Sequence, residues 1–157
     1  MLYPLSYEAS DHESTDATAT AATRYRSASE VEAFVGRIGQ LSGFALECPD
    51  PVTLAAFYSQ VTGWPVVFSS PEWCSIGEGE DFHLSFQRSV DYRPPTWPDP
   101  HSSMQFHLHL RVDDLDTAEA AVTDLGGTAF ADQPQPGTVR VMADPVGHVF
   151  CLVPIRS

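Results

Sequence analysis

The stretch GFALECPDPVTLAAFYSQVTG, residues 43–63, contains the pattern that decides the fold. Residues 43–48 alternate between small or polar side chains and apolar ones, which is typical of a strand with one buried face. Asp50 and Pro51 then have the residue types of a helix N-cap and first turn. Gly63 suits the left-handed conformation that often ends a helix. The stretch therefore predicts a strand over 43–48 and a helix over 51–62.

A second stretch, HLHLRVDDLDTAEAAVTDLGG at residues 107–127, repeats this order 64 positions later. It predicts a strand over 106–112 and a helix from Asp114 to about Leu125, ended by two glycines. Three short strand-like stretches follow each copy, at 64–69, 73–77 and 82–88 and then around 128–131, 138–143 and 148–154. Because helix caps and strand patterns both repeat, the sequence favours duplication of a βαβββ module.

The remaining segments set the expected domain organisation. Residues 1–26 are rich in Ser, Thr, Ala, Asp and Glu and predict a flexible acidic tail. A capping-box spacing at Ser27 and Glu30 and apolar residues at helical spacing predict an amphipathic helix within 27–41. Module one is then expected over 43–90, a stiff proline-rich linker over 91–103 and module two over 104–155. The predicted fold class is α+β, with two tandem modules forming a half-open barrel.

Composition excludes several classes of function. The 157 residues carry a formal net charge of −13, and all eight basic residues are arginine. Lysine chemistry is therefore excluded, and a broad basic surface for nucleic acid or anionic membrane is not expected. Apolar runs are too short to span a bilayer, and the N-terminus lacks the pattern of a secretory signal, so we expect a cytoplasmic protein. Cys48, Cys74 and Cys151 have no CxxC spacing and are expected to be free thiols.

Several of these segments resemble the vicinal-oxygen-chelate superfamily, which includes glyoxalase I, extradiol dioxygenases and bleomycin resistance proteins. The resemblance is carried by Leu46–Pro51, by His107–Asp116 and by the Asp144-Pro145-Val146-Gly147-His148 motif before the last strand. Residues 84–88, 94–98 and 150–153 are similar to an uncharacterised glyoxalase-like branch. The resemblance covers about 43–155 and implies a ligand site built by paired modules, and a homodimer. It identifies a fold better than it identifies a reaction.

Metal-dependent members of this superfamily place one ligand on the first strand and one on the last strand of each module. The resemblance carries these positions to Gly43, His83, His107 and Cys151, so the implied metal ligands are His83, His107 and Cys151. Glycine has no ligating side chain, and cysteine stands where glutamate is usual. The implied cofactor is a divalent Zn, Ni, Mn or Fe ion bound at a degenerate site, or none.

Strand alternation also predicts that the apolar side chains of these strands, among them Phe44, Leu46, Leu84, Phe86 and Phe106, lie under the helices, and that the polar ones face the concave side of each sheet. His107, His109 and Arg111 share one face of their strand, and His83, Ser85 and Gln87 share one face of another. The candidate catalytic residues are His107, His109 and Glu47, since imidazole titrates near neutral pH. Glu47 and Arg111 are alternatively expected to form an ion pair between the modules. The candidate ligand-binding residues are His83, Ser85, Gln87, Arg111, Trp97 and Tyr92.

Two hypotheses about function follow from these residues. The first, slightly favoured by the degenerate metal positions, is a non-catalytic or metal-independent protein that binds a small oxygenated metabolite in the cleft between the modules. The alternative is a metal-dependent lyase, isomerase or dioxygenase that uses His83 and His107. Tyr92 and Trp97 either cover the mouth of this cleft or pack on the outside of the fold.

Overall fold

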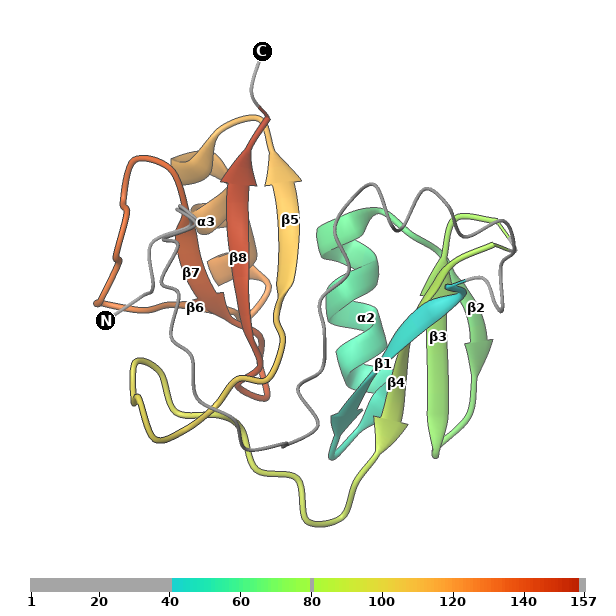
Figure 1. The fold of residues 1–157 in the computed structure, drawn as a ribbon. Helices are drawn as coiled ribbons and strands as arrows, with labels where there is room; N and C mark the ends of the chain where they lie inside the picture. Colours follow the sequence, from blue (N-terminus) through green and yellow to red (C-terminus); the bar gives the residue numbers. More distant parts are fainter. Residues whose placement is uncertain (1–40, 80, 156–157) are drawn as a thin grey trace, which may run out of the picture. The chain divides into compact units, whose positions relative to one another are not determined.

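The computed structural model describes residues 41–79 and 81–155, so the predicted acidic tail and nearly all of the predicted N-terminal helix lie outside the described residues. The elements occur in the predicted order, βαβββ twice over (Figure 1). They are β1 (Gly43–Cys48), α2 (Pro51–Thr62), β2 (Val66–Ser69), β3 (Trp73–Gly77), β4 (His83–Arg88), β5 (Leu108–Val112), α3 (Leu115–Asp124), β6 (Thr128–Ala129), β7 (Arg140–Ala143) and β8 (Val149–Pro154).

The strands form two separate four-stranded sheets with the same topology. Their orders are β1-β4-β3-β2 and β5-β8-β7-β6 (Figure 1). In each sheet the first strand pairs in parallel with the last strand of its module, and the other pairs are antiparallel. This confirms the predicted α+β class and the tandem βαβββ modules. The two sheets do not join into a closed barrel.

Helix α2 has the predicted bounds, and its ends have the predicted chemistry. The Asp50 carboxylate accepts hydrogen bonds from the backbone N–H groups of Val52 and Thr53, and Gly63 ends the helix with φ of 76°. These contacts satisfy backbone groups that a helix end leaves without partners. The second helix is capped in the same way by Asp114, whose carboxylate accepts from the Thr117 N–H.

Several strands are shorter than predicted: β2 begins at Val66 rather than at residue 64, β6 ends at Ala129 rather than at residue 131, and two strands of module two begin two residues late. β5 begins at Leu108 rather than at residue 106, because Gln105 has a positive φ of 56° that interrupts the extended chain before it. β7 begins at Arg140 rather than at residue 138. The N–H groups of Thr138 and Val139 both donate to the Gln135 carbonyl, which holds these residues in a turn.

The two modules share one apolar core around helix α2. Tyr58 on this helix stacks on Phe86 of β4 with ring centroids 5.4 Å apart, and it meets Phe150 of β8 edge-on at 6.1 Å. All three side chains are fully buried. Aromatic pairs in these geometries add to the stabilisation from burial itself. The predicted burial of Leu46, Leu84 and Phe86 is therefore found, with module two also contributing to the same core.

The apolar face of each module is less well covered where its first strand begins. Phe44 and Phe106 are about half exposed, although both were expected to lie under a helix. Their rings stack on each other with centroids 5.8 Å apart, and Phe44 also meets Phe82 edge-on at 5.8 Å. An aromatic contact thus replaces helix packing at these positions.

Candidate functional site

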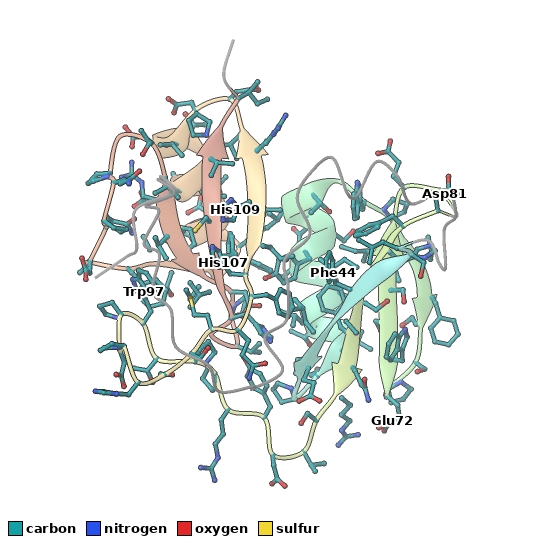
Figure 2. The ribbon with its side chains drawn as sticks, in the orientation of Figure 1. Phe44, Glu72, Asp81, Trp97, His107 and His109 are labelled. Atoms are coloured by element: carbon teal, nitrogen blue, oxygen red, sulfur yellow. The ribbon has the colours of Figure 1, made fainter. Side chains whose placement is uncertain are left out.

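Two histidines of module two lie side by side on one face of the second sheet. His107 precedes β5 and His109 lies within it, so strand alternation directs both side chains to the same side. Their Nε2 atoms are 2.9 Å apart, a hydrogen-bond distance in which one ring donates and the other accepts. Figure 2 shows both imidazoles beside β8. The sequence prediction that these residues share a face is therefore found in the structure.

Cys151 lies next to this pair on the neighbouring strand. It is the register partner of His109 across the parallel pair of β5 and β8. The Cys151 side chain is buried, and burial raises the pKa of its thiol to about 11. Among the described residues, His107, His109 and Cys151 form a group whose potential ligand atoms all lie within 4.8 Å of one another. The predicted candidates His107 and Cys151 are thus brought together, with His109 as the third member.

The charge state of His107 follows from its surroundings. Burial, and next the proximity of the His109 ring, lower the pKa of His107 below its ordinary value of 6.5. The ring is therefore neutral at pH 7, with one nitrogen able to donate and the other able to accept. A neutral imidazole suits an uncharged oxygenated ligand, general base chemistry or metal coordination.

A small pocket opens where the two modules meet, and His107 forms part of its wall. The pocket has a volume of about 90 Å³. Its wall is mostly apolar and contains three polar side chains. The lining residues are Leu46, Tyr58, Pro95, Met104, Phe106, His107, Leu108, His148 and Val149. A mostly apolar wall with a few polar groups is typical of a small-molecule site.

A buried network of hydrogen bonds fixes the other two polar side chains of the pocket. The Tyr58 hydroxyl donates to Asp144 Oδ2 at 3.1 Å, and His148 Nδ1 lies 2.7 Å from the same oxygen. The opposite His148 nitrogen, Nε2, donates to the Glu47 backbone carbonyl at 2.9 Å. Burial and the adjacent Asp144 hold the pKa of Tyr58 well above its ordinary range, so this hydroxyl keeps its proton. The network connects module two to α2 and β1 of module one.

Tyr58 and Asp144 were not predicted as site residues from the sequence. Tyr58 has the pattern of an ordinary core residue of a helix, and Asp144 belongs to a motif that indicates fold rather than chemistry. The one available signal was the Asp144-Pro145-Val146-Gly147-His148 motif, which places a carboxylate and an imidazole four residues apart at a tight turn. The Asp144 Oδ1 atom indeed accepts from the backbone N–H groups of Val146 and His148.

The two aromatic residues of the linker pack on module two. The Tyr92 ring lies 4.9 Å from the His148 ring, and its buried hydroxyl has no hydrogen-bond partner among the described residues. Trp97 packs near Phe130, with ring centroids 6.3 Å apart, and its indole N–H donates to the Asp132 carbonyl. Neither residue lines the pocket between the modules, to which the linker contributes Pro95.

The remaining candidates of module one lie on its own sheet and not beside His107. The Ser85 hydroxyl is buried and lies 2.9 Å from the Ser75 hydroxyl, while Gln87 is exposed. The Glu47 side chain is also exposed, and among the described residues neither Glu47 nor Arg111 takes part in an ion pair. His83 lies against Gly77, where an added Cβ would come within 2.5 Å of the imidazole.

The two module-one positions of the metal site implied by the superfamily, Gly43 and His83, do not supply ligands beside His107 and Cys151. A Cβ added at Gly43 would lie 2.2 Å from the His83 carbonyl oxygen, so a ligating side chain has no room there. His83 is also not part of the His107, His109 and Cys151 group found among the described residues. No reaction step is therefore assigned to a metal held by these four positions.

The described part of the chain contains no helix that is both long and apolar enough to cross a bilayer. Comparison with curated protein sequences gives no significant match. Comparison with solved structures gives many matches. One is a glyoxalase/bleomycin resistance protein/dioxygenase family enzyme from Burkholderia phytofirmans PsJN, with TM-score 0.58 and 20% identity, covering 75% of this chain and all of that one.

Two further solved structures show the same fold. A glyoxalase-related enzyme from Fulvimarina pelagi has TM-score 0.55 and 22% identity, covering 75% of this chain and 89% of that chain. A bleomycin resistance determinant encoded on the transposon Tn5 has TM-score 0.50 and 24% identity, covering 76% and 100%. The family model described as a glyoxalase-like domain matches residues 43–153. With its tandem modules and this match, the chain belongs to the glyoxalase-like domain family, as the sequence resemblance predicted.

Proposed function

We propose that the protein binds a small, uncharged, oxygenated molecule in the pocket between its two modules, without requiring a metal ion. The observation that carries the proposal is the position of His107 in an otherwise largely apolar wall formed by both modules and the linker. Its neutral ring offers one hydrogen bond to a carbonyl or hydroxyl group. The other walls offer apolar contact.

The chemistry of the pocket limits the class of ligand. Both nitrogens of His148 are engaged by Asp144 and by the Glu47 carbonyl, so this ring cannot bond further without breaking the network. The Tyr58 hydroxyl donates to Asp144 and keeps only an acceptor site for a ligand. His107 is therefore the most available polar group of the pocket. The volume of about 90 Å³ is several times the roughly 10–15 Å³ that a cavity needs in order to hold one water, so it suits a small molecule.

Titration by protein NMR tests this proposal, with acetophenone and cyclohexanone as neutral carbonyl probes. We expect shifts at the pocket residues that persist in the presence of a chelator. Replacing Leu108 with Trp fills the pocket and should abolish these shifts. Replacing Val90, which is 88% exposed and lies outside the pocket, with Trp is the matched control and should preserve them. Equal shifts in both variants would contradict the proposal.

Replacing His107 with Ala distinguishes a binding protein from an enzyme. A binding protein should keep its fold and bind the probes about tenfold more weakly, as expected for the loss of one hydrogen bond. Consumption of a carbonyl substrate by the wild type, lost in this variant, would instead favour the lyase, isomerase or dioxygenase alternative.

We also infer that two chains associate. Support comes from the edge strand β2, where Val66, Val67 and Phe68 are each about half exposed, since an exposed apolar edge strand is normally covered or paired. Light scattering over a range of concentrations tests this inference, and a monomer at high concentration would contradict it.

A further inference from the structure

We propose that His107, His109 and Cys151 form a three-ligand site for a late transition-metal ion, held entirely within module two, with Zn²⁺ as the expected occupant. This site differs from the four positions implied by the superfamily, because His109 replaces the ligands of module one. It also goes beyond the proposed binding of a small molecule. Cys151 and His109 do not line the pocket, so the two proposals can fail independently.

The backbone itself brings the three ligands together. β5 and β8 are adjacent parallel strands, and His109 and Cys151 are register partners across them. His107 lies one alternation before His109 and therefore projects from the same side. The two rings are 4.8 Å apart between centroids. No movement of the modules is needed to assemble this group.

The distances are close to those that a zinc ion requires. Zinc binds imidazole nitrogen at about 2.0–2.1 Å and thiolate sulfur at about 2.3 Å, so tetrahedral ligand atoms lie about 3.3–3.6 Å apart. The two Nε2 atoms are 2.9 Å apart, and all three ligand atoms lie within 4.8 Å of one another. The separations that zinc requires lie between these two values. Three protein ligands leave the fourth position open, as in catalytic zinc sites.

The ligand types select the class of metal. Two imidazoles and a thiolate suit Zn²⁺ and other late transition metals, whereas Mg²⁺ and Ca²⁺ prefer sites made of oxygen ligands. On binding, the Cys151 S–H bond breaks, a sulfur–metal bond forms, and the proton passes to solvent without any change of oxidation state. The Nε2–Nε2 hydrogen bond is replaced by two nitrogen–metal bonds.

The surroundings of the site provide both support and access. Cys151 is 7% exposed and packs with Val141 and Val149 in a small apolar cluster, which holds the sulfur in place. His109 is exposed, so an ion reaches the site from solvent. The net charge of −13 raises the local concentration of cations around the protein.

Cobalt spectroscopy and zinc competition test the proposal. Both use the full chain, purified without an affinity metal and treated with chelator. We expect one equivalent of Co²⁺ to produce a thiolate-to-cobalt charge-transfer band together with the intense visible bands of a tetrahedral site. Zn²⁺ should remove these bands. Replacing Cys151 with Ser should abolish the charge-transfer band, and replacing His109 with Ala should weaken Zn²⁺ binding by about 100-fold or more, since even supporting residues contribute 10- to 100-fold.

Two control variants separate this site from other sites. Replacing Cys74 with Ser, a buried cysteine of module one, and replacing His83 with Ala should leave the cobalt spectrum unchanged. Should the Cys151 variant fail to fold, the variant at the exposed His109 still decides the outcome. The proposal is overturned if no stoichiometric metal is taken up, if replacing His109 leaves the affinity unchanged, or if replacing His83 removes the metal. Binding of acetophenone by a metal-free protein would leave the proposed small-molecule function standing in each of these cases.

Discussion

The two modules have the same backbone and carry different chemistry at matching positions. In module one, Ala45 pairs with Ser85 across the parallel strands β1 and β4. In module two, the corresponding pair across β5 and β8 is His109 and Cys151. The Ser85 hydroxyl lies 2.9 Å from the Ser75 hydroxyl, which also accepts from the Trp73 indole N–H. Module one thus uses this position for internal hydrogen bonds, and module two keeps its nitrogen and sulfur atoms available.

The same backbone therefore carries imidazole and thiol groups at these positions of module two and none at the matching positions of module one. Gly43 and His107 occupy the same place in their modules, 64 positions apart. At Gly43 the close His83 carbonyl leaves no space for any side chain. The candidate site is therefore concentrated in module two, while module one contributes a wall of the pocket and part of the core.

The largest expected effect comes from breaking the network that connects the modules. Replacing Asp144 with Ala leaves the buried Tyr58 hydroxyl and His148 ring without their shared acceptor. We expect the free energy of unfolding to fall by about 3–5 kcal/mol, as is typical when one partner of a buried polar cluster is removed. Urea denaturation measures this change. Replacing Asp81, an exposed aspartate before β4 of module one, with Ala is the matched control and should change stability by less than about 0.5 kcal/mol.

High pH should destabilise each module through one buried thiol. Burial raises the pKa of both Cys48 and Cys151 to about 11 from an ordinary value of 9.0. Because the folded state holds these protons more tightly than the unfolded state, the stabilisation is fully present below about pH 9 and is lost as pH rises toward 11. At about pH 10.5 each thiol should reduce the free energy of unfolding of the metal-free protein by about 2 kcal/mol.

Cysteine variants test this explanation of the pH dependence. Replacing Cys48 with Ala should remove about a third of the alkaline loss of stability, measured by urea denaturation near pH 7.5 and 10.5, because the raised pKa values of Cys151, Tyr58 and Tyr92 account for the rest. Replacing both cysteines should remove most of it. An alkaline loss that is identical in all variants would show that other groups cause it.

The matching positions 43 and 107 should respond differently to the same side chain. Replacing Gly43 with Ala forces the backbone near His83 to move, and we expect a loss of about 2 kcal/mol, within the usual range for overpacking. Replacing His107 with Ala should cost less than about 1 kcal/mol, because this side chain lies beside a pocket and is half-buried. Thermal and urea denaturation of the two variants give the comparison. Equal losses of stability would contradict the inference that the backbone leaves no room for a side chain at position 43 and leaves room at position 107.

The smallest expected effects come from the ion pairs on each module. Arg88 and Glu72 of module one are both well exposed, so replacing Arg88 with Ala should change stability by less than about 0.5 kcal/mol. Arg140 of module two has a side chain only 15% exposed and pairs with Asp116. Its replacement with Ala should cost about 1 kcal/mol, partly through lost packing. Reversal of this order, measured by urea denaturation, would contradict the role given to burial.

Much of the fold followed from local sequence chemistry, because the decisive signals lie within a few residues of one another. Asp50, Pro51 and Gly63 define both ends of α2, and the structure has these bounds. The start of β5 was wrong by two residues, since the positive φ of Gln105 has no sequence signal comparable to that of glycine.

The site was less predictable because it depends on contacts between distant segments. Strand alternation placed His107 and His109 on one face, but the pairing of His109 with Cys151 depends on the register of β5 and β8. The same limitation applies to Tyr58 and Asp144, which are 86 positions apart and meet only when the modules pack together. The resemblance to metal-dependent relatives implied that His83 is a ligand, whereas the structure groups His109 with His107 and Cys151.

Elemental analysis tests most directly whether module two alone supplies the metal ligands. The wild type and the His107→Ala and His83→Ala variants are compared, all purified without added chelator or affinity metal. We expect close to one equivalent of a late transition metal, with zinc as the expected ion, in the wild type and in His83→Ala, and less than about a tenth of this in His107→Ala. Loss of the metal in His83→Ala, or equal metal content in all three proteins, would contradict it.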